Sequence, residues 1–585
     1  MDAPPIYRSQ DNRYRQGFSE PVARAPSHSH SVRDTALLPE PYIVLRQKSL
    51  SPAEQMDTIA TAVYDYLAQP GGTPVRVRAT QRKPIIDFYK ENGFAPLWVT
   101  QDGLSDKARR LLALLSKADE EGLNAQDYLP ASLSGFDVSG DSLEKSPDDL
   151  ARLEIELTAA ALEYSHHVSA GRVKPIRVSE LHTIKAQPVK PSDVLTKFKT
   201  STQPDTYLAS LQPLIPQYQY LKKALAKYRK SGSEKEQAII IPGGKLIRAG
   251  GSDRRIELVA KRLQQLGYYR IPDEQDAENK TFYNPELVAA VKDFQKQSGL
   301  NNEGIIGSQT LGALNGKSDA EKINKIILSM ERLRWLPQDL KSKYVFVNQA
   351  FFETWMMDGG KEVYRSDVIV GRPKFQTAVF ADEMEKVTLN PNWYVPRTII
   401  YEEMIPKLLQ NPYYLADLGY EVTDRNGKSV DSSTIDWGRY GQDSIPFDVR
   451  QPPGPKNALG RVKFMFPNEH SIYMHDTPAR ELFKKSVRAF SHGCVRLQKP
   501  MKFAEIILGT QGWTPERIKA AVASGENQTI FLDQKIPVYL GYYTAWADAD
   551  GNVETRDDIY SRDRTLNQAL EQNIQARSSR KYASR

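Results

Sequence analysis

The spacing of apolar residues predicts helices from about residue 53 to residue 235. Apolar positions recur there at intervals of three and four, as on the buried face of an amphipathic helix. The clearest helix is indicated by Leu104, Ala108, Leu111, Leu112, Leu115 and Ala118. Ser105 is suited to be its N-cap, and Gly122 lies just past its end. Residues 148–170 and 205–230 predict further helices, so we expect one helical domain at 53–235.

A second, smaller group of helices is predicted at residues 250–316. Two amphipathic segments, "RRIELVAKRLQQLGYY" and "NPELVAAVKDFQKQSGL", precede a short third one, "GSQTLGALNG". We expect a small three-helix core formed by Leu258, Leu263, Leu266, Val288, Val291, Phe294 and Leu300. The polar stretch "SGSEKE" near 231–236 predicts a linker between the two groups of helices.

The apolar period then changes from about 3.6 residues to about 2, which indicates strands. The segment "KYVFVNQAFFETWMMDGGKEVYRSDVIVG" alternates, is rich in β-branched and aromatic residues, and has a turn at Asp358-Gly359-Gly360. Further strands are predicted at "RVKFMFP", "SIYMH", "TIFLD" and "IPVYLGYYTAW". Residues 320–562 therefore predict a β-rich domain, with a helical insertion at about 397–450.

Both ends of the chain lack such patterning. Residues 1–52 mix Pro, Ser, Arg and His with little periodicity, which predicts a disordered arm. Residues 563–585, which end in "EQNIQARSSRKYASR", predict a frayed basic tail. The expected fold class is multi-domain α+β, with a helical domain, a three-helix module and a β-rich domain.

Composition excludes a few classes of protein. The net charge of +7 is small for 585 residues, and no long basic block alternates with aromatic residues, so no nucleic acid partner is expected. No stretch approaches about eighteen consecutive apolar residues, so no membrane span is expected. The first residues show no apolar signal-peptide core, so the sequence shows no export signal. One cysteine excludes an internal disulfide, and it is compatible with an oxidising compartment.

That cysteine, Cys494, lies near histidines in the sequence. His475 ends the predicted strand "SIYMH", and His492 lies two positions before Cys494. A thiol must lose its proton to act as a nucleophile, and a histidine with an orienting partner can accept it. The small residues of "SHGCV" favour a tight turn that exposes the sulfur. The amides of Gly493 and Cys494 could then stabilise an oxyanion.

The residues alone leave two other interpretations open. A lone cysteine is often a buried packing residue. The second interpretation is a zinc site with the ligands His475, Asp476, His492 and Cys494. Adjacent residues on a strand point to opposite faces, however, so joint ligation by His475 and Asp476 is awkward. His166 and His167 diverge by about 100° on a helix, which favours packing or a surface position over a metal site.

The motif around Cys494 resembles that of a known family. His475 followed by "SHGCVR" at 491–496 is similar to the signature of the L,D-transpeptidase catalytic domain of the YkuD type: a histidine, a spacer, Ser/Thr-His-Gly-Cys, an apolar residue, and Asn or Arg. The stretches "GPKNALGRVKFMFPNEHSIYMHDTP" and "LNPNWYVPRTI" look like the large periplasmic members. Residues 253–315 resemble the peptidoglycan-binding-domain-1 module, and residues 84–175 resemble the helical scaffold region of those transpeptidases.

The resemblance implies a role for each residue of the motif. Cys494 is expected to be the acylated nucleophile and His475 its general base, oriented by the backbone carbonyl of Asp476. His492 and Gly493 are expected to shape the turn. The implied substrate-binding residues are Ser491, Arg496, Trp393 and Tyr394. The insertion at 397–450 corresponds to a lid-like capping subdomain.

The implied reaction is an acyl transfer that needs no metal and no cofactor. The thiolate attacks the bond between the third stem residue, a diamino acid, and the terminal D-alanine of a peptidoglycan tetrapeptide. The acyl group then passes to an amine of another stem. Hydrolysis by an L,D-carboxypeptidase, attachment of an outer-membrane protein to the wall, and non-catalytic peptidoglycan binding remain alternatives. A periplasmic monomer is expected, with stem peptides and glycan as partners.

Overall fold

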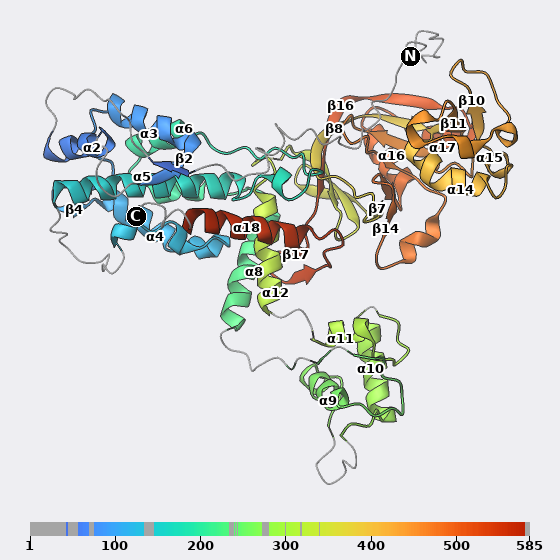
Figure 1. The fold of residues 1–585 in the computed structure, drawn as a ribbon, viewed down its shortest axis with the longest axis horizontal. Helices are drawn as coiled ribbons and strands as arrows, with labels where there is room; N and C mark the ends of the chain where they lie inside the picture. The colour runs from blue at the N-terminus through green and yellow to red at the C-terminus, as the bar shows by residue number, and fades with distance from the viewer. Residues whose placement is uncertain are drawn as a thin grey trace. The chain divides into compact units, whose positions relative to one another are not determined.

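The computed structural model forms two compact units, which Figure 1 shows as a ribbon. The first, here the cysteine unit, comprises Glu180–Thr183 and Thr354–Tyr539. The second, here the helical unit, comprises Glu40–Ser179, Ile184–Glu353 and Leu540–Arg585. The residues that the structure describes are 42–44, 57–68, 75–133, 146–232, 239, 241–242, 244–271, 280–298, 300–315, 319–338 and 340–578. The multi-domain α+β class is thus confirmed.

Amphipathic helices build the helical unit, as predicted. They are α2 (Thr58–Ala68), α3 (Ala79–Glu91), α4 (Asp106–Leu115), α5 (Pro147–Ala170), α6 (Pro191–Thr200), α7 (Pro204–Ala209), α8 (Pro216–Gly232), α12 (Asp319–Leu333) and α18 (Arg562–Ser578). Helix α5 packs against α2 and buries an almost continuous apolar face. The predicted cap of α4 is confirmed, because the Ser105 hydroxyl accepts a hydrogen bond from the amide of Ala108 at 3.2 Å. Gly122 ends the following turn at a φ of +66°.

Short strands complete the helical unit. They are β1 (Tyr42–Val44), β2 (Arg76–Arg78), β3 (Val99–Thr100), β4 (Gly103–Leu104), β5 (Lys343–Asn348), β17 (Ala545–Ala547) and β18 (Val553–Thr555). Strand β1 pairs antiparallel with β2, so the disorder predicted for residues 1–52 is wrong at 42–44, where the apolar "YIV" forms a strand. The rest of that arm lies outside the described residues, as does most of the predicted linker at 231–236.

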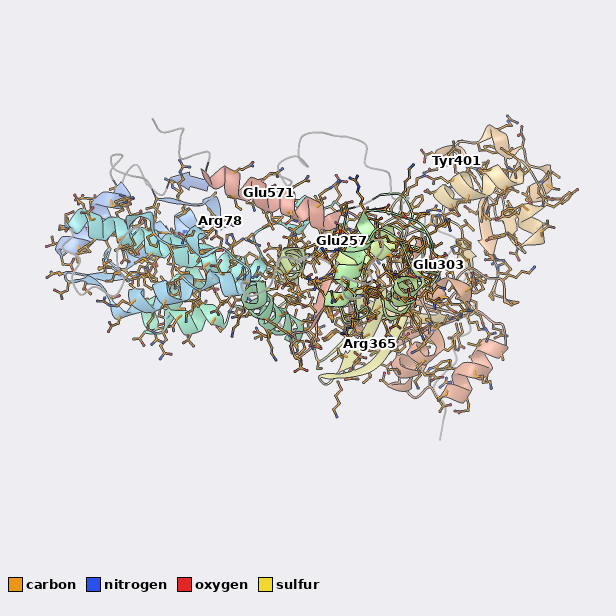
Figure 2. All side chains as sticks on the ribbon, turned by 90° about the horizontal axis from the view of Figure 1, so that it is seen from below. Arg78, Glu257, Glu303, Arg365, Tyr401 and Glu571 are labelled. Atoms are coloured by element: carbon orange, nitrogen blue, oxygen red, sulfur yellow. The ribbon has the colours of Figure 1, made fainter. Side chains whose placement is uncertain are left out.

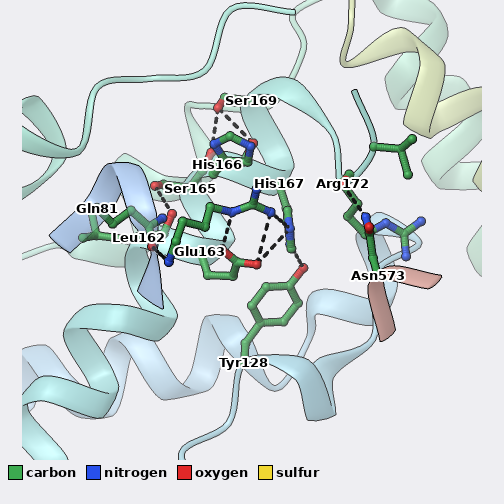
Figure 3. Close-up of polar contacts among 12 residues, drawn as sticks. Gln81, Tyr128, Leu162, Glu163, Ser165, His166, His167, Ser169, Arg172 and Asn573 are labelled. Atoms are coloured by element: carbon green, nitrogen blue, oxygen red, sulfur yellow. Dashed lines mark hydrogen bonds and ion pairs between the residues drawn. The ribbon is translucent and has the colours of Figure 1, made fainter. Parts of the chain in front are cut away.

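His167 is a buried packing residue of α5. Arg78, from β2, lies within the helical unit (Figure 2) and donates a hydrogen bond from its Nε to Glu163 at 2.6 Å. Figure 3 shows His167 between this ion pair and Tyr128, whose hydroxyl lies 2.7 Å from His167 Nδ1. Within the described ranges no group of three or more His, Cys, Asp or Glu side chains is placed to hold a metal ion.

The three predicted helices of the small module are present as α9 (Arg255–Gln265), α10 (Pro285–Gln297) and α11 (Ser308–Asn315). Leu263, Val291 and Phe294 lie in its core as predicted. Leu266 does not, because it caps the C-terminal end of α9 and is 38 % exposed. Ile247 from before α9, Tyr283 and Ile306 from the segments between the helices, and Leu314 from α11 also belong to the core.

The predicted strands of the cysteine unit form one mixed sheet. Its strands are β6 (Glu353–Asp358), β7 (Lys361–Gly371), β8 (Phe380–Leu389), β12 (Val462–Met465), β13 (Met474–His475), β14 (Ala489–Ser491), β15 (Val495–Leu497) and β16 (Gln528–Gly541). The order across this part of the sheet is β14-β7-β15-β13-β12-β8-β16, and β6 also pairs with β7. Gly359 and Gly360 turn from β6 into β7 at positive φ, as the hairpin predicted from the sequence requires.

Helices and an insertion surround this sheet. Helix α16 (Pro500–Gly509) packs Phe503 against Tyr364 and Phe464, and α17 (Pro515–Ala523) follows it. The capping insertion, residues 397–450, contains α13 (Arg397–Ile399), the π-helical turn η6 (Ile400–Met404), α14 (Ile405–Leu408), α15 (Tyr414–Asp417), β10 (Glu421–Thr423) and most of β11 (Asp448–Gln451). Strand β9 (Trp393–Tyr394) precedes the insertion and pairs with β11.

A hydrophobic core of its own supports the capping insertion. This core consists of Val395, Ile400, Met404, Ile405, Leu408, Leu415, Val422, Trp437, Ile445 and Val449. Because these side chains pack on one another, the insertion holds its shape through contacts within itself.

The frayed tail predicted for residues 563–585 is wrong as far as Ser578, because α18 occupies Arg562–Ser578. Asp563 is buried in the first turn of α18, where it accepts a hydrogen bond from Arg332 at 2.6 Å. Leu566 and Ala569 are buried on the same helix. None of the helices among the described residues is long and apolar enough to cross a membrane.

Candidate active site

Two adjacent parallel strands bring His475 close to Cys494. Strand β13 pairs with β15 so that Met474 lies opposite Val495 and His475 opposite Arg496. The amide of Val495 donates to the carbonyl of Tyr473 at 3.0 Å, which extends the pairing by one residue toward Cys494. Residues two apart on a strand share a face, so Cys494 and His475 are diagonal neighbours on one face of the sheet.

The imidazole of His475 is held in one orientation. Its Nδ1 lies 2.5 Å from the backbone carbonyl oxygen of Asp476, which is the contact that the family resemblance implies. Since a carbonyl only accepts, Nδ1 carries the proton and Nε2 keeps a lone pair. Burial is the largest of the influences that lower the pKa of His475 to about 3; the cations of Arg496 and Lys463 act in the same direction, and the hydrogen bond to Asp476 opposes them. His475 is therefore neutral near pH 7.

The carboxylate of Asp476 anchors this strand end. It accepts hydrogen bonds from the amide of Arg461 at 2.8 Å and the amide of Thr477 at 2.7 Å, and it pairs with Arg480. It packs against Gly460, where φ is +62° and where a Cβ would overlap the carboxylate. These contacts hold the Asp476 backbone, and with it the carbonyl that orients His475.

Side-chain hydroxyls hold the turn that carries Cys494. Thr377 donates from its hydroxyl to the carbonyl of Gly493 at 2.7 Å. Ser491 donates to the carbonyl of Cys494 at 2.6 Å and accepts from the amide of Gly493 at 3.1 Å. Gly493 has a φ of +113°, a conformation that favours glycine.

The hydrogen bonds of the turn bear on two predictions. Ser491, an expected substrate-binding residue, is only 1 % exposed, and its hydroxyl is engaged within the turn. The Gly493 amide already donates to Ser491, which removes it as an expected oxyanion donor in this conformation. The amide of Cys494 has no hydrogen-bond partner among the described residues, so it is the amide that can face an oxyanion.

Opposing influences set the acidity of Cys494. Burial raises the pKa of the thiol, while hydrogen bonds from Tyr473 and the cations of Lys463 and Arg496 lower it; the net pKa lies above its usual value. In the strand registers, His475 on β13 lies opposite Lys463 on β12 and opposite Arg496 on β15. The two cations therefore lie on either side of the imidazole. At neutral pH the resting pair is thus a thiol beside a neutral imidazole.

His492 does more than shape the turn. Its Nε2 lies 2.8 Å from an Arg372 nitrogen and 2.8 Å from an oxygen of Glu403. Arg372 follows β7 and Glu403 lies in η6 of the capping insertion. Sequence reasoning missed both partners, because nothing near them in the sequence marks the contact.

The remaining predicted substrate residues differ in exposure. Arg496 is largely buried, its Nε has no hydrogen bond, and it forms no ion pair with another described residue. Tyr394 is 63 % exposed on β9. Its neighbour Trp393 points the other way along the strand and packs on the core of the capping insertion. Tyr473 and Lys463, which sequence reasoning missed, adjoin Cys494 and His475.

Three families match separate parts of the chain. Residues 83–225 match "Scaffold domain", residues 252–314 match "Putative peptidoglycan binding domain", and residues 342–520 match "L,D-transpeptidase catalytic domain" (YkuD). The last match includes both His475 and Cys494.

Parts of the chain are also similar to individual proteins. A "Putative L,D-transpeptidase" of Haemophilus influenzae is 36 % identical over 245 residues, which cover 42 % of this chain and 49 % of the relative, so the chain spans about half of that relative's length. An L,D-transpeptidase structure from Enterococcus faecium has 12 % identity, a TM-score of 0.17, and covers 34 % of this chain and 50 % of its own. One from Mycobacterium smegmatis has 11 % identity, a TM-score of 0.16, and covers 34 % and 58 %. By these family matches, residues 342–520 form an L,D-transpeptidase catalytic domain (YkuD), alongside a scaffold domain at 83–225 and a putative peptidoglycan binding domain at 252–314.

Proposed function

We propose that this protein is a periplasmic peptidoglycan L,D-transpeptidase with Cys494 as its nucleophile. The observation that carries the proposal is the placement of His475 and Cys494 on one face of adjacent parallel strands, with His475 Nδ1 held by the Asp476 carbonyl. The carbonyl attacked is that of the diamino acid in a tetrapeptide stem. Its bond to D-alanine breaks, D-alanine leaves, and a thioester to Cys494 forms.

The acidities of the pair favour proton transfer during the attack. As the sulfur attacks, its proton moves to His475 Nε2, because the thiol is not ionised beforehand. The imidazolium formed is strongly acidic next to Lys463 and Arg496, so it readily gives the proton to the amine of the departing D-alanine. In the second step His475 takes a proton from the incoming amine, and the sulfur leaves as the amide forms. The enzyme is then restored.

Three groups of the cysteine unit suit the substrate. The amide of Cys494 is the proposed oxyanion donor, since it has no other partner among the described residues. Arg496 is the proposed partner of a substrate carboxylate, because a largely buried cation without an ion pair gains most from an anionic ligand. Tyr394, exposed on β9, is the proposed aromatic contact, with Trp393 supporting it from the core of the insertion.

The other domains are proposed to hold the enzyme on its polymer. The module at 252–314 would bind peptidoglycan and raise the local concentration of stems near Cys494. A stem amine as the final acceptor makes the product a crosslink between third-position residues. Water or a protein amine as acceptor would use the same thioester.

The test is incubation of the purified full-length protein with a disaccharide-tetrapeptide, with products identified by liquid chromatography and mass spectrometry. We expect free D-alanine and a crosslinked dimer from the native protein, and neither from Cys494→Ala. Dimer formed by Cys494→Ala would refute the nucleophile. Tripeptide without dimer would identify a carboxypeptidase, and binding to intact cell-wall sacculi without either product would identify a non-catalytic wall protein.

A further inference from the structure

A charged cluster joins the capping insertion to the turn that carries Cys494. Arg372 donates a hydrogen bond to Glu403 Oε1 at 2.6 Å. His492 Nε2 lies 2.8 Å from the same oxygen. We call Arg372, Glu403 and His492 the clamp. Its members come from the loop after β7, from η6, and from the residues just before Cys494, so three segments distant in the sequence meet at one carboxylate.

The clamp is partly withdrawn from water, which makes its contacts stronger than those of a surface pair. The His492 ring lies 4.9 Å from the ring of Phe375, and the Arg372 guanidinium lies 4.7 Å from the same ring. Although burial raises the pKa of Glu403, Arg372 and His492 bring it below its usual value, so the carboxylate stays ionised. Burial lowers the pKa of His492, so the imidazole is neutral and can donate Nε2–H to Glu403.

A neighbouring ion pair joins the same segments at the surface. Glu402, next to Glu403 in η6, pairs with Lys374 at 2.7 Å. The Lys374 side chain is 67 % exposed, whereas those of Arg372 and His492 are 36 % and 23 % exposed. The two carboxylates are similarly covered, with Glu402 27 % and Glu403 32 % exposed, so the pairs differ in the exposure of the partners. An exposed pair contributes little because water screens it. Glu402 is therefore a matched control for Glu403, with the same residue type, the same helical turn and the same two segments.

The location of the clamp suggests its use. The capping insertion has its own hydrophobic core, so it can move as a body unless something ties it to the sheet. Glu403 ties it to His492, two residues from the nucleophile. A thioester reacts with water as well as with amines, and exclusion of water determines which reaction prevails.

We propose that Glu403 is a positioning residue that, through Arg372 and His492, keeps the capping insertion against the Cys494 turn and so favours acyl transfer to an amine over hydrolysis. The inference rests on the proposed function. In transfer, the thioester carbon–sulfur bond breaks as an amide bond forms, and the amine proton passes to the thiolate. In hydrolysis, water supplies the new oxygen and the proton. Glu403 has no contact with Cys494 in the structure, so thioester formation itself does not require it.

The experiment compares Glu403→Gln with Glu402→Gln in the full-length protein. Three quantities are measured: the rate of acyl-enzyme formation by intact mass, the ratio of hydrolysed tripeptide to crosslinked dimer, and amide hydrogen exchange in residues 397–408. For Glu403→Gln we expect the ratio to rise about tenfold, as for loss of a charge-assisted hydrogen bond. Exchange in 397–408 rises with it, while acylation changes less than about threefold. Glu402→Gln should match the native protein in all three.

Arg372→Met removes the other charged partner of Glu403 and should raise the product ratio and the hydrogen exchange in the same way as Glu403→Gln. Agreement between the two variants guards against a folding defect in one of them. Faster exchange with an unchanged product ratio would overturn the proposed effect on water. Unchanged exchange in both clamp variants would overturn the clamp itself. A native protein that forms no acyl-enzyme would refute the proposed function instead, and the exchange measurement would still decide whether Glu403 restrains the insertion.

Discussion

The packing of Gly460 against Asp476 predicts that Gly460→Ala weakens both the fold and the reaction. Gly460 adopts a φ of +62°, and a Cβ there would lie well inside 3.0 Å of the Asp476 carboxylate. Gly359 adopts a similar φ of +57°, yet a Cβ there meets nothing within 4 Å. The pair separates the cost of the backbone conformation from the cost of moving Asp476.

The magnitude follows from the contacts. A left-handed conformation costs a non-glycine residue roughly 1–2 kcal/mol, which is the whole cost expected for Gly359→Ala. At Gly460 the carboxylate must also move, and it loses at least one hydrogen bond of about 1.5–3 kcal/mol. The expected total for Gly460→Ala is about 2.5–5 kcal/mol. Since the Asp476 carbonyl orients His475, acylation should slow by about tenfold to a hundredfold.

Native-state hydrogen exchange of peptides that include β12 and β13 measures the local free energy of opening, and intact mass measures acylation. Gly359→Ala should leave acylation unchanged. Equal losses of local stability in the two variants, or native acylation in Gly460→Ala, would refute the reasoning that Asp476 transmits the change to His475.

Three further predictions concern charge. The pKa of His475 is about 3 in the folded state and near 6.5 in the unfolded state, so the unfolded state binds more protons between these pH values. The free energy of unfolding should therefore fall by about 1.4 kcal/mol per pH unit as the pH drops through this window. In urea titrations, His475→Asn should remove this contribution to the pH dependence. Because the pKa of Cys494 is raised, the alkylation of its thiol by iodoacetamide should accelerate from pH 7 to pH 9. The Lys463 cation lowers this pKa, so Lys463→Met should slow alkylation severalfold at pH 8, whereas Lys502→Met, at an exposed site, should not. Buried Glu331 pairs with the buried Arg334 and the partly buried Arg172, and Glu331→Gln removes the carboxylate that they share. We expect this change to cost about 3–5 kcal/mol of local stability, measured by hydrogen exchange in α12; a loss below about 1 kcal/mol would contradict a structural role for these ion pairs.

Local patterns predicted the parts of the fold in which each residue's neighbours along the chain determine its structure. The spacing from Leu104 to Ala118 predicted α4 and its cap, and alternation predicted β6 and β7 with the turn at Gly359. Residue 563 onward was misread because α18 shows weak amphipathicity. Its contacts include the ion pair of Asp563 with Arg332, which is distant in the sequence, and the buried side chains of Leu566 and Ala569.

In the candidate site, too, local motifs were predicted and contacts between distant residues were not. The nucleophile and the orienting carbonyl of Asp476 were expected from one short motif and its family resemblance. The hydrogen bonds of the Ser491 hydroxyl within the turn could not be foreseen, because they depend on the backbone conformation of the turn. Arg372 and Glu403 could not be found from the motif, since the fold alone brings them to His492.

In the proposed reaction the acyl group is carried on Cys494. The most direct test is peptide mapping by mass spectrometry after a brief incubation of the full-length protein with a disaccharide-tetrapeptide. We expect a substrate adduct that has lost D-alanine, attached to the peptide containing Cys494 and released by hydroxylamine, as a thioester should be. An adduct on any other residue, or D-alanine release by Cys494→Ser at the native rate, would contradict it.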